Sequence, residues 1–443
     1  MMQTAIQYLS DIASMIWGFP MIFLLVGTHL YLTILLRCPQ RHIFRAIKLS
    51  ITPDSASKGD VSPFAALTTA LAATIGTGNI IGVGTAVALG GPGAVFWCWC
   101  TGLLGISTKY AESLLSIKYR TTTPDGRVVG GPMYVLERAL GMRWLGILFA
   151  LFTLFASFGL GNLVQSNAIA VITQESLDIP PLYTGIVLAA LVASVLVFGL
   201  RGISRVCAFF VPVMTVGYFV GCVYILVQNA PYLGETVRVI VEGAFTPSAV
   251  GSGVFGGSIL LAARYGIARG LFSNESGMGS SPILAASART STPTNQALIA
   301  SSATFWDTVV ICCMTGLVIV SSLIAYPEIA QHDGNKLTYA AFSKIPVVGS
   351  LLLSCGMVCF AFSTILGWFF YSERAFEYLG GRRFITPYRL FYSLLVVLGS
   401  VFPLELVWSF ADINNALMAI PNLVALLLLS SVVVRETRKA NLL

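Results

Sequence analysis

The stretch "ATIGTGNIIGVG", residues 73–84, lies in the middle of an apolar run long enough to cross a membrane. Glycine costs about 1 kcal/mol relative to alanine inside a helix. A backbone that leaves the helix within lipid must find its hydrogen bonds in protein or water. Gly76, Thr77, Gly78 and Asn79 therefore mark either a weak point in a membrane helix or a site. The rest of the sequence decides between the two.

The composition places the chain in a membrane. Of its 443 residues, 56% are hydrophobic and only 10% are charged, and the mean hydropathy is +0.82. Soluble globular proteins carry about 25% charged residues. The net charge of +7 does not indicate nucleic-acid binding, because the membrane topology accounts for where the basic residues lie.

About 20 apolar residues are needed for each crossing of the bilayer. Hydropathy predicts an all-α polytopic protein with eleven spans, numbered 0 to 10 in chain order: 17–36, 62–89, 92–117, 144–172, 182–199, 207–228, 253–287, 297–324, 347–371, 388–402 and 409–434.

Lysine and arginine concentrate in cytoplasmic loops of membrane proteins. With these spans, 20 of the 26 basic residues, Lys58 among them, fall in loops on one side, and three fall inside spans. The opposite loops hold only Arg238, Lys336 and Lys344. A wrong span count would scramble this alternation. The N-terminus is therefore predicted to lie outside and the C-terminus in the cytoplasm.

Spans 1–5 then begin on the inside and spans 6–10 begin on the outside. Two five-span halves of opposite topology form the 5+5 inverted repeat of many secondary transporters. The expected organisation is an extra N-terminal span with a cytoplasmic loop (1–60), a first repeat (61–229), an extracytoplasmic loop (230–250), a second repeat (251–435) and a cytoplasmic tail (436–443).

In this plan, the first span of each half is interrupted near the bilayer midplane. The first span of the second half contains "ARGLFSNESGMGSSP", residues 268–282. Glycines alone would allow close helix packing, but packing does not require Asn79, Asn274 and Glu275. A broken helix exposes amides at one end and carbonyls at the other. The amides suit a carboxylate and the carbonyls suit Na⁺ or an ammonium, so a zwitterionic amino acid fits both.

Two further spans carry polar groups. Asn162, Gln165 and Ser166 share one face of span 3, where they either contact substrate or bond neighbouring helices. On span 8, Ser363 and Thr364 offer two hydroxyl oxygens to a hard cation, although such hydroxyls often bond their own helix.

Ionisable residues within spans are costly to insert. Lys109 and Glu112 are three residues apart on span 2 and are predicted to pair with one another. Glu275 is expected either to pair with Arg264 or Arg269 or to accept a proton.

Several stretches resemble the alanine/glycine:cation symporter family: "GTGNIIGVGTAVALGGPGAVFW", "STKYAE", "GGPMYVLERALG", "RGLFSNESGMGSSPI" and the span-8 segment. The resemblance covers about residues 60–435. It implies the amino acid–polyamine–cation superfamily, a leucine-transporter-like inverted repeat and a multi-pass protein of a prokaryotic cytoplasmic membrane. Family members carry alanine or glycine inward with Na⁺, less often with H⁺, and some carry glutamine.

The resemblance also implies roles for individual residues. Those matching the family's substrate site are Thr77, Gly78, Asn79, Gln165, Phe272, Ser273, Asn274, Gly279 and Trp368. A sodium ion would lie between the carbonyls of Ala72 and Ile75 and the hydroxyls of Ser363 and Thr364. Taken alone, Trp368 reads as an interfacial aromatic. Ser276 departs from the family's usual alanine, and "ARYGIARG" also differs from the common pattern.

The sequence thus predicts a secondary active symporter of small neutral amino acids, with Na⁺ as the co-transported ion and the lipid bilayer as its surroundings. A proton-coupled carrier using Glu275 or Glu112, or a carrier preferring glutamine or serine, remains an alternative. A polytopic membrane enzyme is disfavoured because no HExxH, paired-Asp or Ser/His arrangement is present. A channel is disfavoured because no repeated ring of charges is present.

Overall fold

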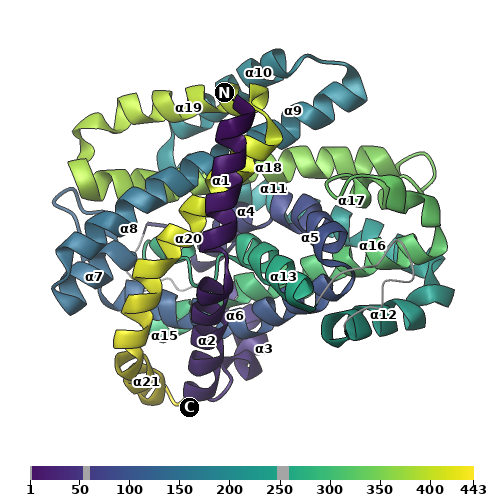
Figure 1. Ribbon diagram of the computed structural model, residues 1–443. Coiled ribbons are helices and arrows are strands. Elements are labelled where there is room, and N and C mark those ends of the chain that lie inside the picture. The colour runs from purple at the N-terminus through teal and green to yellow at the C-terminus, as the bar shows by residue number, and fades with distance from the viewer. Residues whose placement is uncertain (1, 53–59, 247–258) are drawn as a thin grey trace.

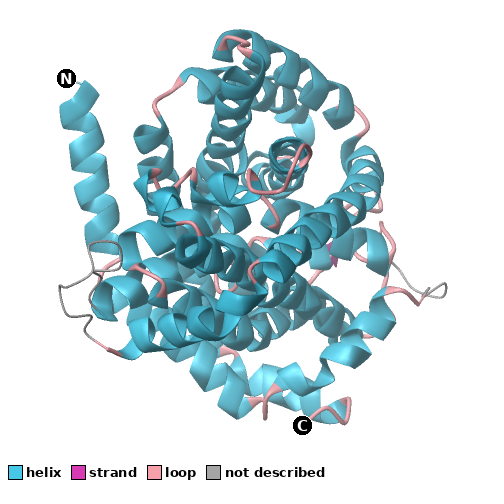
Figure 2. Ribbon diagram, turned by 90° about the vertical axis from the view of Figure 1, so that its right-hand side faces the viewer, coloured by secondary structure: helices cyan, strands magenta, loops and turns pink. Residues whose placement is uncertain are grey.

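The computed structural model describes residues 2–52, 60–246 and 259–443, and these residues are almost entirely helical (Figures 1 and 2). Lys58 and the first residues of the predicted span 253–287 lie outside this part of the chain. Regular strand is limited to the hairpin of β1 (Thr121–Thr122) and β2 (Val128–Val129) within the described residues.

The first half of the chain begins with α1 and α2, which meet at a 42° bend and run one after the other along the front of the molecule (Figure 1). Its elements are α1 (Met2–Ile16), α2 (Phe19–Leu35), η1 (Pro39–His42), α3 (Ile43–Ser50), α4 (Pro63–Thr74), η2 (Gly78–Gly82), α5 (Val83–Gly90), α6 (Gly93–Lys118), α7 (Pro132–Leu140), α8 (Arg143–Ala156), η3 (Ser157–Leu163), α9 (Val164–Leu177), α10 (Pro181–Leu196) and α11 (Gly199–Gln228).

The second half is helical in the same way. After η4 (Ala230–Tyr232) and α12 (Leu233–Phe245) come α13 (Ile259–Asn274), α14 (Ser281–Ala285), α15 (Pro293–Thr304), η5 (Phe305–Cys312), α16 (Cys313–Ala325), η6 (Pro327–Gln331), α17 (Leu337–Phe342), α18 (Gly349–Gly380), η7 (Arg382–Phe384), α19 (Ile385–Val401), α20 (Leu404–Leu428) and α21 (Ser430–Lys439).

Within the described residues, each predicted span overlaps a helix or a run of helices. In the described chain, six helices are long and apolar enough to cross a membrane, or eight if each of two bent pairs counts as one span. The structure therefore has the polytopic helical architecture expected from the sequence. It also contains helices outside the predicted spans, and two of them are long. Residues 2–16 form α1, and the expected connecting loop 230–250 contains α12.

Close helix approaches place the interrupted segments at the centre of the molecule. The helix α6 packs along α13 and α15, and α4 packs against α18 and α11. A Cβ at Gly367 of α18 would lie 2.8 Å from the Cβ of Ala73, and a Cβ at Gly270 of α13 would lie 2.1 Å from Thr101 Oγ1. Only glycine allows these contacts, which bring α18 against the end of α4 and α13 against α6.

Candidate functional site

The first interruption follows α4. Ile75 leaves the helical conformation with a ψ of 103°, and the helix axis bends by 49° between Pro63–Thr74 and Gly78–Gly90. The Asn79 side chain caps this break, because its Oδ1 accepts a hydrogen bond from the Gly76 amide at 2.9 Å. The stretch that looked like a weak point is thus an ordered turn held by its own asparagine.

The second interruption lies between α13 and α14. Glu275, Gly277 and Gly279 have φ values of 56°, 91° and 79°. The Asn274 Oδ1 accepts a hydrogen bond from the Ser276 amide at 2.8 Å and so holds the turn in the same way as Asn79 holds the first. A left-handed backbone at a non-glycine residue such as Glu275 costs on the order of 1–3 kcal/mol, and such strain clusters at functional sites.

Gly279 requires the absence of a side chain, because a Cβ there would lie 2.6 Å from Pro132 Cγ. Its place in the fold is therefore to let the span-6 break pack against the start of α7. Any contact of Gly279 with a ligand has to come from its backbone.

The two breaks meet directly, and Asp307 joins them. A Cβ at Gly78 would lie 3.0 Å from Phe272 Cδ1 and 3.3 Å from Ser273 Cα. Asn79 Nδ2 donates to Asp307 Oδ1 at 2.8 Å, and Ser273 Oγ donates to Asp307 Oδ2 at 2.8 Å. All three polar side chains are fully buried. Both broken spans therefore share one carboxylate on η5.

Asp307 was missed in the sequence analysis. The signal for it was a lone acidic residue in the middle of the predicted span 297–324, and intramembrane ionisable residues are functional candidates by default. No pattern in the sequence linked it to either break, since its partners lie 228 and 34 residues away.

The oxygens expected to hold Na⁺ are also close together. Thr364 Oγ1 lies 2.8 Å from the carbonyl oxygen of Ala72 and 3.3 Å from that of Ile75. These carbonyls lie at the C-terminal end of α4, where the helix dipole is negative. Ser363 is next to Thr364, and its Oγ donates to the Phe360 carbonyl of its own helix at 2.9 Å. Carbonyl and hydroxyl oxygens are typical ligands of hard cations.

Of the three polar residues on span 3, one reaches the break. Gln165 Oε1 accepts a hydrogen bond from the Thr77 amide at 3.4 Å. Asn162 Nδ2 donates instead to the Tyr392 carbonyl at 2.8 Å, and Ser166 Oγ bonds back to the Asn162 carbonyl at 2.9 Å. Gln165 therefore contacts the first break, whereas Asn162 bonds a neighbouring helix and Ser166 bonds its own helix.

Trp368 is fully buried, so the interpretation of this residue as an interfacial aromatic is wrong. Gly161 makes room for it, since a Cβ at that position would lie 2.3 Å from Trp368 Cβ. Its ring also makes an edge contact with Tyr371, with centroids 5.4 Å apart. The Trp368 side chain therefore lies inside the bundle, where α18 packs against η3.

Thr77 Oγ1, Asn274 Nδ2, Glu275 Oε1 and Trp368 Nε1 are among the buried polar atoms that lack a hydrogen-bond partner within the described residues. Buried polar groups are normally hydrogen-bonded, so each exception needs an explanation. These atoms on the two breaks and on Trp368 are available to hydrogen-bond a small polar ligand.

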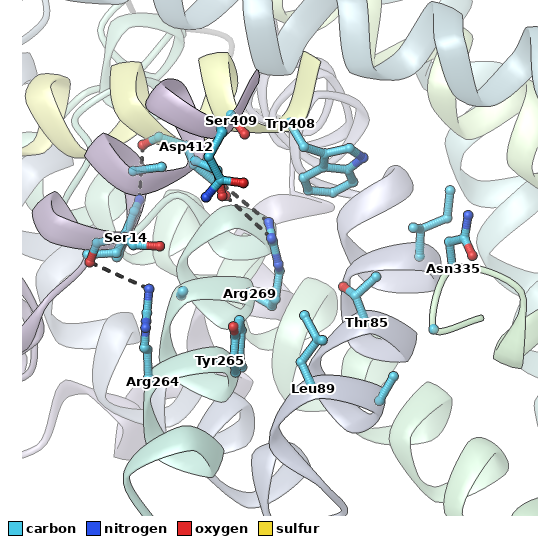
Figure 3. A pocket seen from close by; sticks show the side chains of 18 residues that line it. Ser14, Thr85, Leu89, Arg264, Tyr265, Arg269, Asn335, Trp408, Ser409 and Asp412 are labelled. Atoms are coloured by element: carbon cyan, nitrogen blue, oxygen red, sulfur yellow. Dashed lines mark hydrogen bonds and ion pairs between the residues drawn. The ribbon is translucent and has the colours of Figure 1, made fainter. Parts of the chain in front are cut away.

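A pocket of about 560 Å³ opens above the second break (Figure 3). Its floor contains Arg269, whose guanidinium lies 3.2 Å from Asp412 Oδ1 and 4.5 Å from the centroid of the Trp408 ring. The Trp408 ring in turn stacks on Phe272 at 4.8 Å. The Arg269–Asp412 ion pair and the stacked rings of Trp408 and Phe272 therefore separate this pocket from the second break. Ser273 directly follows Phe272 in the chain.

The same contacts correct one expectation and assign a place to α1. Glu275 does not pair with an arginine, because Arg269 pairs with Asp412 and Arg264 donates to the Ser14 carbonyl at 3.5 Å. The helix α1 forms one wall of the pocket, and Trp17 Nε1 at its end donates to the Asp412 carbonyl at 3.0 Å.

Comparison with known proteins extends over the whole chain. The model of the sodium:alanine symporter family matches residues 2–441. The sodium/alanine symporter AgcS of Methanococcus maripaludis is 45% identical, with 98% of this chain and 97% of that protein covered. The probable sodium/glutamine symporter GlnT of Bacillus subtilis is 34% identical, with 98% and 90% covered.

Among solved structures, a substrate-bound Na⁺-coupled sialic acid symporter in an outward-open state matches with a TM-score of 0.51 at 13% identity. The match covers 94% of this chain and 84% of that protein. At this level of identity the likeness shows a shared transporter fold.

Proposed function

This chain belongs to the sodium:alanine symporter family, and from this premise we propose that it imports alanine and glycine together with Na⁺ by alternating access. The observation that carries the proposal is the fully buried junction at which Asn79 and Ser273, from two broken helices, donate to the same carboxylate of Asp307. Such a junction couples any movement of one break to the other.

The substrate lies at this junction in the proposal. Its carboxylate accepts from backbone amides at the start of η2, and its ammonium group lies near the carbonyls that end α13, because these helix ends carry opposite partial charges. The proposed substrate-binding residues are Thr77, Gly78, Asn79, Gln165, Phe272, Ser273, Asn274, Gly279 and Trp368. In this proposal the rings of Phe272 and Trp368 limit the substrate to a small side chain.

Na⁺ is proposed to bind the carbonyls of Ala72 and Ile75 with the hydroxyls of Thr364 and Ser363. The carbonyl oxygens of Ala72 and Ile75 are both within hydrogen-bond distance of Thr364 Oγ1. Binding there requires the Ser363 hydroxyl to turn away from its own helix. A cation at this point stabilises the exposed end of α4 and hence the broken form that receives the substrate, which couples the two fluxes.

For the topology, we propose eleven spans with an N-terminus outside and a cytoplasmic C-terminus, in a prokaryotic cytoplasmic membrane. The two inverted repeats would comprise residues 61–229 and 251–435, with 1–60, 230–250 and 436–443 outside them. The charge asymmetry of the loops and the matching positions of the two breaks support this arrangement. The pocket above Arg269 then opens to the outside, and α1 is a wall of the outer entrance.

A substrate preference for glutamine is the second candidate, because the family includes the related probable sodium/glutamine symporter. A substrate site with more space around Phe272 and Trp368 than alanine fills would favour glutamine. A transport assay separates these substrates directly.

The proposal is tested with the purified protein in liposomes. An inward Na⁺ gradient is expected to concentrate labelled alanine inside, and replacing Na⁺ with choline is expected to abolish this. Competition with glycine, serine, glutamine and D-alanine ranks the substrates. If the Na⁺ gradient does not concentrate any of these amino acids, the proposed function is wrong.

The sodium site makes its own prediction. The variant Thr364→Ala is expected to raise the Na⁺ concentration for half-maximal uptake about tenfold, because one lost ligand costs about 1–2 kcal/mol. Thr364→Ser, which keeps the hydroxyl, is expected to restore the parental value. The matched control is Thr153→Ala, which removes an equally buried hydroxyl that bonds only its own helix. An unchanged Na⁺ requirement in Thr364→Ala would remove this residue from the site.

A further inference from the structure

Lys109 is a fully buried lysine in α6 that the proposed function does not use. Among the described residues, its Nζ has neither a hydrogen-bond partner nor an ion pair with a carboxylate. The expectation that it pairs with Glu112 is wrong, because Glu112 Oε1 accepts instead from the Gly277 amide and from Asn422 Nδ2, the latter at 3.0 Å. A buried charge is costly unless something balances it, so Lys109 needs an explanation.

The packing of α6 places Lys109 beside the second break. One turn before it, a Cβ at Gly105 would lie 2.9 Å from Ser276 Oγ. One turn after it, Glu112 holds the Gly277 amide. The lysine therefore lies alongside residues 275–277, at the C-terminal end of α13, where the helix dipole favours a cation.

Four titratable groups interact electrostatically with Lys109. They are Glu112 on α6, Glu275 in the break, Asp307 on η5 and His29 on α2. The His29 Nδ1 is hydrogen-bonded to Thr108 Oγ1 at 2.7 Å. One ammonium group thus lies among three buried carboxyl groups.

Two of these carboxyl groups have a free oxygen. Glu112 Oε2 and Glu275 Oε1 are both buried, and neither has a hydrogen-bond partner among the described residues. A lysine ammonium has three donors on a flexible four-carbon stem. It is suited to serve both carboxylates in turn as the break changes shape.

Resting on the proposed function, we propose that Lys109 is the built-in cation of the transport cycle. Its fixed charge offsets one of the two negative charges that Glu112 and Glu275 carry beside the second break. Without this charge, a proton from water would have to neutralise one of these two carboxylates, whichever side of the membrane the substrate site faces. With it, Na⁺ is the only cation that has to enter from solution, and alanine uptake does not require protons.

The test is alanine uptake into liposomes by the full-length protein, driven by a Na⁺ gradient at about pH 6 and about pH 8. The parent protein is expected to show the same uptake at both values and no effect of a protonophore. Lys109→Gln is expected to lose about tenfold at the higher pH, because a carboxyl group must then be protonated. Its uptake is expected to recover as the pH falls and to become sensitive to a protonophore. Lys109→Arg, which keeps the charge, is expected to stay independent of pH.

A double variant keeps the inference testable if Lys109→Gln is inactive at every pH. Lys109→Gln with Glu112→Gln removes one charge of each sign, and the remaining amide oxygen still accepts from Gly277 and Asn422. This double variant is expected to recover at least about threefold over the single one and to lose its pH dependence. The inference is overturned if Lys109→Gln keeps the parental pH profile, or if the double variant recovers nothing. Absence of Na⁺-driven uptake by the parent protein would instead contradict the proposed function.

Discussion

Replacing Asn79 with alanine is expected to lower Na⁺-driven alanine uptake about 100-fold. The side chain makes two buried bonds at the first break, accepting from the Gly76 amide and donating to the Asp307 carboxylate. Leaving a buried partner unsatisfied costs about 1–3 kcal/mol, and each 1.4 kcal/mol is a factor of ten. Both the turn at Gly76 and the junction with Asp307 are lost together.

The matched control for this variant is Asn167→Ala. Asn167 is also buried within a predicted span, and its Nδ2 donates to two backbone carbonyls, those of Gly399 and Phe402. It has no contact with either break in the described structure, so uptake is expected to stay within about threefold of the parent. If both asparagine variants transport equally well, Asn79 contributes to the fold alone and the proposed junction is incorrect.

The second large effect is expected for Asp307→Asn, with a loss of about 100-fold in uptake. The carboxylate accepts from three side chains: Asn79 Nδ2 at 2.8 Å, Ser273 Oγ at 2.8 Å and Thr308 Oγ1 at 2.6 Å. An asparagine has one side-chain oxygen, and its NH₂ group would face a donor. At least one of the two breaks is then released, at a cost of the same order as above.

The control for losing a negative charge elsewhere in the protein is Asp178→Asn, at the end of α9. This aspartate is exposed and has a left-handed backbone that asparagine also tolerates. Its variant is expected to transport like the parent. Uptake by Asp307→Asn at the parental rate and Na⁺ requirement would show that the shared carboxylate does not couple the breaks.

The relation between the sequence and the site is clearest at the two breaks. Glycine, asparagine, serine and proline within apolar runs predicted both interruptions, because these residues weaken a helix wherever it lies. The positions agree with the ends of α4 at Thr74 and of α13 at Asn274. The resemblance to the symporter family then assigned Gln165 and Trp368, which spacing on their own spans could not do.

Lys109 and Glu112 show where spacing misled. Residues three apart on a helix are neighbours on its surface, so a pair between them was the natural prediction. The structure packs that face of α6 against the second break, and the Gly277 amide and Asn422 take the Glu112 carboxylate instead. Contacts between distant segments outweighed the local arrangement.

The sequence by itself determined the membrane environment, the positions of the long apolar helices and the places where two apolar segments break. These depend on about 20 consecutive residues at a time, and hydropathy and helix propensity act at that range. Only the tertiary structure decided that both breaks share Asp307, that Trp368 lies inside the bundle, that α1 lines the pocket at Arg269 and that Lys109 lies beside the second break. Each of these depends on side chains from segments far apart in the chain, which helix packing alone brings within hydrogen-bond distance.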